Sequence, residues 1–174
     1  MKSLSTYISE KFLISNDIDV NKHFVVPKSP NELRDIIFER HKKNKEFLDL
    51  TDIDISMIGN SFSNSNGVTI FGNCYCSQVK EIDVTGWDTS GIKNMNRTFS
   101  YFDNLKVIHG IEDWDVSNVT DFRNMFTDCC SLSSKYFNIS KWNVQNRAKM
   151  TGMFWKCKKE IMPSWYNKEK HCKA

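Results

Sequence analysis

Long hydrophobic runs are absent from this chain of 174 residues. No stretch approaches the ~20 consecutive apolar residues that a membrane-spanning helix needs. Polar residues also interrupt residues 1–20 before the apolar core of a signal peptide can form. We therefore expect a cytoplasmic protein without membrane contact. Glycine and proline are scarce, with 7 and 3 residues, while 40% of the residues are hydrophobic. This composition is typical of a folded chain and excludes a disordered one.

Motifs for catalysis and for metal binding are absent as well. The cysteines include a Cys-x-Cys and a Cys-Cys pair, whose spacing differs from that of structural zinc sites. Without a secretion signal, a disulfide framework is not expected. The four histidines lie in unrelated contexts, and the chain has no glycine-rich phosphate loop. We therefore expect no enzymatic activity, no cofactor, no metal and no small-molecule substrate.

Charge is unevenly distributed along the chain. Residues 1–50 carry nine cationic and eight acidic side chains, residues 51–140 carry six and eleven, and residues 141–174 carry nine and two. The acidic middle argues against a uniform nucleic-acid-binding stripe. The basic C-terminal end is most simply a solvated terminus, although it leaves nucleic-acid binding open there.

Residues 1–47 are predicted to form an N-terminal capping module. Apolar residues four positions apart predict a short helix over residues 4–13, and the β-prone residues 23–26 stop at a proline. Ser29, followed by a proline and then by Glu32, predicts the start of a second helix with a capping box. A strand and an amphipathic helix need a surface to pack on. We expect them to cover the open edge of the repeats that follow.

Residues 48–157 contain a repeat marked by tryptophan. Trp87, Trp114 and Trp142 are spaced by 27 and 28 residues, and an earlier, degenerate unit carries an extra loop within residues 60–69. Each tryptophan is followed by apolar residues at eight and twelve positions and by Cys or Phe at fifteen. The corresponding sets are Met95, Phe122 and Met150; Phe99, Phe126 and Phe154; and Phe102, Cys129 and Cys157.

A fixed period in this range is the signature of a solenoid. Phe122, Met125 and Phe126 have the i, i+3, i+4 spacing of a helix, and residues 81–84 and 106–108 alternate as strands do. The sequence therefore predicts an α/β repeat of about four β-α units, with strands on one side and short helices on the other.

The recurring tryptophans and cysteines are expected to be core residues. They occupy equivalent positions, so burial explains them better than base stacking or redox chemistry does. This interpretation covers Cys74, Cys129 and Cys157. The serine of each Trp-Asp-Val-Ser turn is expected to hold the turn by bonding to neighbouring backbone.

The pattern W-D-[TV]-S-x-[VI]-x-[DN]-[MF]-x-x-x-F-x-x-[CF] resembles the BspA-like leucine-rich repeats, also described as the DUF285 or "Mycoplasma surface" repeat family. The resemblance covers about residues 24–157. It implies a short, right-handed, leucine-rich-repeat-like solenoid and a role in binding macromolecules without catalysis. Many relatives are long, secreted and surface-attached, which leaves a surface adhesin as an alternative. The last unit loses the Asp and Ser after Trp142, which indicates that the array ends near Cys157.

We expect a non-enzymatic module that presents the surface of the array to a protein partner. A narrower hypothesis is that a phage or mobile element encodes it to inhibit a host defence protein. Two faces are candidates for the contact. They are the polar side of the strands, with Asp83, His109 and Asn138, and the exposed helix side, with Lys93, Arg97, Arg123 and Asn124.

Residues 158–174 are predicted to form a C-terminal cap and a basic tail. Trp165 and Tyr166 are well placed to cover the open end of the last unit. Alternatively, these aromatics form a contact site for single-stranded nucleic acid together with Lys158 and Lys159.

Overall fold

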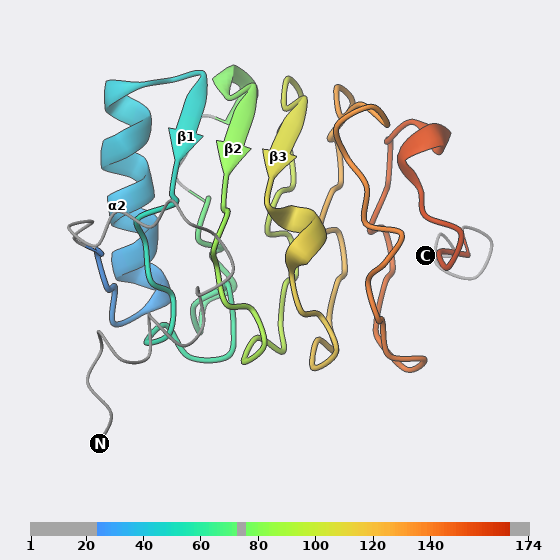
Figure 1. The fold of residues 1–174 in the computed structure, drawn as a ribbon, viewed down its shortest axis with the longest axis horizontal. Helices are drawn as coiled ribbons and strands as arrows, with labels where there is room; N and C mark the ends of the chain where they lie inside the picture. The colour runs from blue at the N-terminus through green and yellow to red at the C-terminus, as the bar shows by residue number, and fades with distance from the viewer. Residues whose placement is uncertain (1–23, 73–75, 168–174) are drawn as a thin grey trace, which may run out of the picture.

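The computed structural model describes residues 24–72 and 76–167. They form segments that run across the long axis of the molecule and are stacked side by side along it, with the helix α2 at one end and residues 158–167 at the other (Figure 1). The helix predicted over residues 4–13 lies outside the described residues.

Helix α2, Pro30–Lys43, begins where the capping residues predict it. The Ser29 hydroxyl accepts a hydrogen bond from the amide of Glu32 at 3.2 Å, and proline occupies the first helical turn. In a capping box, the Glu32 carboxylate would accept from the amide of Ser29. Here it accepts from the amide of Lys28 at 2.9 Å. The helix packs beside β1. The buried side chains of its inner face are Leu33, Ile37 and His41.

Three short parallel strands form one sheet in the order β1-β2-β3. The strands are Phe47–Asp49, Glu81–Asp83 and Val107–His109. Their paired central residues point into the interior and are fully buried; they are Leu48, Ile82 and Ile108. The two strands predicted within the repeats are therefore confirmed to within one residue at each end. Of the β-prone run predicted at residues 23–26, the described residues 24–26 contribute a single bridge, between Val25 and Ile53.

The predicted solenoid of four β-α units is wrong. The described residues contain one α-helix, α2, and three strands, so the short helix expected in each unit does not form. Residues 121–128 run instead as consecutive turns. Asn124 and Asp128 have φ angles of 57° and 61°, and a left-handed residue ends an α-helix of L-amino acids. The described residues also contain no strand at Phe137, the position that corresponds to Ile82 and Ile108, because this residue lies in irregular structure.

Stacked turns replace the predicted helices on the side of the molecule away from the sheet. We call this the turn side, and its segments are residues 94–101, 121–128 and 149–156. Alternate amides of each of the first two segments donate to carbonyls of the next segment, at 2.7–3.0 Å. An α-helix would satisfy these amides within the segment. Hydrogen bonding between segments explains why helical residue spacing occurs here without a helix.

Rows of aromatic rings fill the interior. The ring centroids of Trp87 and Trp114 are 6.2 Å apart, and the row continues to Trp142 and Trp165 at 6.5 Å steps. The first three are 4–6% exposed, which confirms the prediction that the recurring tryptophans are core. A second row of stacked or tilted rings comprises Phe71, Phe99, Phe126 and Phe154.

The recurring cysteines pack beside these rows. The Cys129 thiol donates to the Phe99 carbonyl and the Cys157 thiol to the Phe126 carbonyl, each at 2.9 Å. Burial raises the pKa of the Cys157 thiol to about 12, so it stays protonated at neutral pH. The packing interpretation is therefore confirmed for these two residues. Cys74 lies outside the described residues.

Candidate partner-binding surface

Two of the three strand-side residues of the predicted contact, Asp83 and Asn138, form hydrogen bonds within their own turns. Asp83 and His109 are register partners on β2 and β3, whereas Asn138 belongs to no strand. The Asp83 carboxylate accepts from the amide of Thr85 at 2.9 Å. The Asn138 side chain accepts from the amide of Ser140 at 3.0 Å. His109 is exposed, with its Nε2 at 3.5 Å from a carboxylate oxygen of Glu81.

The same turn geometry recurs in the Trp-Asp-Val-Ser motif. The Asp side chain forms the bond that was predicted for the Ser side chain. The Asp115 carboxylate accepts a hydrogen bond from the amide of Ser117 at 2.9 Å. Hydrogen bonds from the Ser117 side chain and backbone lower the pKa of Asp115. Asp88 and Ser90 are arranged in the same way at 3.1 Å. Much of the repeated polar chemistry is thus used to form turns.

The second predicted face lies on the turn side, although no helix carries it. Arg97, Arg123 and Asn124 meet at a shallow hollow of roughly 430 Å³. Lys93 is exposed but does not line it. The remaining lining residues are polar or glycine: Ser63, Asn64, Ser65, Gly67, Asn94, Asn96 and Asp121.

The two arginines of this hollow differ in their partners. Two nitrogens of the Arg123 guanidinium donate hydrogen bonds to the Asp121 carboxylate, with an Nη2–Oδ2 distance of 2.6 Å. Burial alone would raise the pKa of the Asp121 carboxyl, but hydrogen bonds and charge from Arg123, with a hydrogen bond from Asn96, lower it. The exposed Arg97 side chain makes no hydrogen bond or ion pair within residues 24–72 and 76–167. Of the two arginines, Arg97 is therefore the one whose guanidinium is free to bind a partner.

Arg97 also has an unfavourable backbone conformation. Its φ is 56°, and the corresponding residues of the next two segments are Asn124 and Gly152, at 57° and 69°. Asparagine and glycine tolerate this region, whereas a residue such as arginine loses about 1–2 kcal/mol in it. Tyr101, four residues on, has a φ of 67° and is 60% exposed. Two large side chains are therefore held outward in strained positions on one segment.

A second hollow, of roughly 470 Å³, lies between this segment and the extra loop of the degenerate unit. It is lined by Gly67, Val68, Thr69, Phe71, Gly72, Ser77, Arg97, Thr98, Ser100 and Tyr101. Arg97 thus lies between the two hollows. We call Asn64, Val68, Arg97, Tyr101 and Arg123 the Arg97 surface.

Sequence reasoning missed Tyr101 and the loop residues Asn64 and Val68. The available signal was the loop itself, because it is the place where the regular repeat is interrupted. The described part of the chain brings together no group of three or more His, Cys, Asp or Glu residues that could hold a metal ion.

The C-terminal residues of the prediction lie elsewhere. Trp165 stacks on Trp142, and its indole nitrogen donates to the Ile139 carbonyl at 3.1 Å. Tyr166 is buried with its ring edge-on to Phe154. These contacts cover the end of the aromatic rows, with Tyr166 buried and Trp165 half-buried, as the predicted cap requires. The other two residues of the predicted C-terminal contact site are Lys158 and Lys159. Their side chains are exposed, and they line neither hollow.

Comparison with known proteins identifies the family. The family model described as "Mycoplasma protein of unknown function, DUF285" matches residues 67–169, which is more than half of the chain. The chain therefore belongs to the DUF285 family. No match was found among curated proteins or among solved structures. Within the described ranges, no helix is long and apolar enough to span a bilayer.

Proposed function

We propose that this member of the DUF285 family is a non-enzymatic protein-binding module that contacts its partner through the Arg97 surface. The supporting observation is Arg97 itself. Its guanidinium has no partner among the described residues, its backbone is strained, and it lies between two hollows. Strain of this kind persists where it serves a function.

The chemistry of the surface favours a partner with an acidic group. A guanidinium binds a carboxylate through two parallel hydrogen bonds, which gives both strength and orientation. Arginine and tyrosine are enriched among residues that dominate binding energy. Tyr101 is therefore the second anchor. The Asn64 side chain at the rim accepts from the amides of Asn66 and Val68, so it holds the loop in shape.

A pull-down from the native host tests this function. The bait is the whole chain as wild type, as Arg97→Asn and as the control Lys106→Asn. Asn suits the left-handed position, so the first variant removes the guanidinium without adding strain. Lys106 is an exposed cation beside β3 and lines neither hollow of the Arg97 surface. We expect a partner with wild type and control but not with Arg97→Asn. Equal recovery with all three baits, or no protein partner at all, would count against the proposal.

Two finer assignments belong to this proposal. The Trp-Asp-Val-Ser pattern supports placing the chain with the BspA-like leucine-rich repeats. The narrower role, inhibition of a host defence protein by a phage or mobile element, is tested by co-expression with candidate defence systems. Loss of defence with wild type but not with Arg97→Asn would support it, and full defence in every pairing would refute it.

A further inference from the structure

The row of parallel bridges on the turn side ends at a segment that is paired on one side only. Ser61 pairs with Asn94, Asn94 with Asp121, and Asp121 with Lys149. Lys149 has no further partner in the part of the chain that the structure describes. Beyond it, the row has an open edge.

The open edge presents the backbone groups that one more bridge would use. In the last bridge, the amide of Lys149 donates to the Thr120 carbonyl at 2.9 Å, and the amide of Phe122 donates to the Lys149 carbonyl at 2.8 Å. The equivalent free groups on the far side are the carbonyl of Ala148 and the amide of Met150. Neither has a hydrogen-bond partner among the described residues. A parallel strand needs this pairing of one acceptor and one donor.

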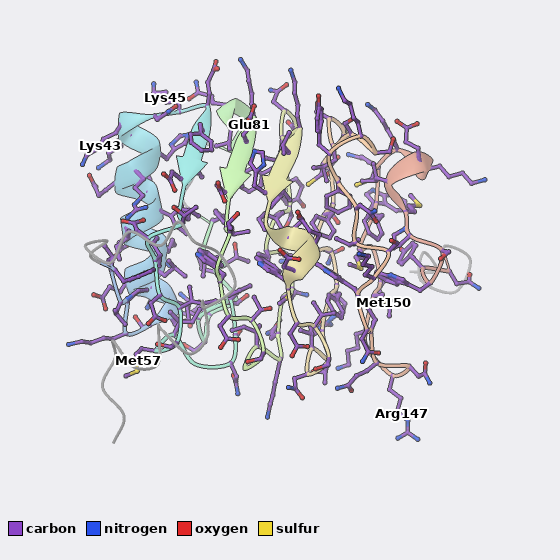
Figure 2. All side chains as sticks on the ribbon, in the orientation of Figure 1. Lys43, Lys45, Met57, Glu81, Arg147 and Met150 are labelled. Carbon is purple, nitrogen blue, oxygen red and sulfur yellow. The ribbon has the colours of Figure 1, made fainter. Side chains whose placement is uncertain are left out.

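A basic hollow of roughly 570 Å³ lies at the same edge. Its lining residues are Arg123, Asn146, Arg147, Ala148, Lys149, Met150 and Thr151. Figure 2 shows the Arg147 side chain extending away from the ribbon at this end of the molecule. The exposed side chains of Arg147 and Lys149 make no ion pair among the described residues. Two free cations therefore flank the free backbone groups.

We propose that residues 147–152, the Lys149 edge, bind an extended acidic segment of a partner protein as one more parallel strand. An amide of that segment donates to the Ala148 carbonyl, and one of its carbonyls accepts from the Met150 amide. Its acidic side chains pair with Arg147 and Lys149. Strand addition of this kind takes affinity from the backbone and specificity from side chains.

Charge selects this occupant. The described residues 141–167 carry six cationic side chains and one acidic side chain, which attract an acidic segment. Arg123 lines both this hollow and the hollow of the Arg97 surface, whereas Arg97 lines only the latter, so variants of Arg147 and Lys149 test this edge without changing Arg97.

The probe is a short synthetic peptide of alternating glutamate and valine, added to the whole chain labelled for NMR. We expect the exchange of the Met150 amide with solvent to slow roughly tenfold on binding, because the amide becomes hydrogen-bonded. The amide of Phe122, already bonded to Lys149, serves as the internal reference. Binding that leaves Met150 exchange unchanged would overturn the proposal.

Two matched controls separate strand addition from simple charge attraction. Arg147→Ser with Lys149→Ser should weaken binding roughly tenfold, whereas Lys158→Ser with Lys159→Ser removes the same charge and should change it little. The same peptide with N-methylated backbone amides keeps its charge but cannot donate to Ala148, so it should not bind. Equal binding by both double variants, or by the methylated peptide, would show that the cations act only as diffuse charge and would overturn the proposal.

Discussion

Trp114 lies in the middle of the aromatic interior. Its ring stacks between those of Trp87 and Trp142, at 6.2 and 6.5 Å, and it also packs against Phe62 and Phe99. Its indole nitrogen is buried without a hydrogen-bond partner among the described residues, whereas that of Trp87 donates to a backbone carbonyl at 3.0 Å. Packing alone therefore holds the Trp114 side chain in place.

Replacing Trp114 tests whether it is a structural residue. We expect Trp114→Ala to lower the free energy of unfolding by about 3–5 kcal/mol, because it leaves a large cavity between stacked rings. Trp155→Ala is the control, because that ring is 51% exposed, and it should change stability by less than ~0.5 kcal/mol. Urea denaturation followed by circular dichroism measures both. A loss below ~1 kcal/mol for Trp114→Ala would mean that the residue is not core.

Tyr101 allows the backbone strain to be measured apart from any partner. Tyr101→Asn keeps a side chain suited to a φ of 67°, so the free energy of unfolding should rise by up to about 1 kcal/mol. Tyr136→Asn is the matched control, because Tyr136 is 53% exposed and its φ is not positive. Chemical denaturation compares the two variants. A fall in stability for Tyr101→Asn would show that the ring, and not the strain, governs this position.

At the scale of elements, α2 could be predicted and the turn side could not. The start of α2 is set by local groups, with the Ser29 hydroxyl bonding an amide three residues on, so the sequence reveals it. Phe122, Met125 and Phe126 face inward in a helix and in stacked turns alike. The choice depends on amides that bond to the next segment, and residues such as Arg97 give no local sign of a left-handed φ.

The inner face of α2 makes stability depend on pH. His41 is 3% exposed and its Nε2 has no hydrogen-bond partner among the described residues. Burial, and then the charge of Lys45, lowers the pKa of His41 from 6.5. The unfolded chain therefore binds a proton at higher pH than the folded chain does. The contribution of His41 to stability is complete above pH 6.5 and is lost as the pH falls from 6.5 through the lower folded pKa.

Denaturation at a series of pH values measures this dependence. We expect His41→Leu to remove most of the decline in the free energy of unfolding below pH 6.5. His109→Gln should keep it, because His109 is exposed on β3. A decline of equal slope in wild type and His41→Leu would show that other groups cause it.

At the scale of the whole molecule, inward and outward residues have separate roles. The aromatics and cysteines that recur in the sequence fill the interior, and the recurring aspartates hold turns. Sequence comparison within the chain could therefore predict the core. It could not locate the Arg97 surface with the same success, because that surface combines one extra loop with residues that differ from their counterparts in the other segments, such as Arg97 beside Asn124 and Gly152.

The central claim is that Arg97 is retained for binding at a cost to the fold. The free energy of unfolding of Arg97→Asn, measured against wild type by chemical denaturation, tests it most directly and needs no knowledge of the partner. Asn suits a φ of 56°, and the guanidinium makes no hydrogen bond or ion pair among the described residues that its loss would break. We predict a rise of up to about 1 kcal/mol. A fall of ~1 kcal/mol or more would show that Arg97 stabilises the fold and would contradict the claim.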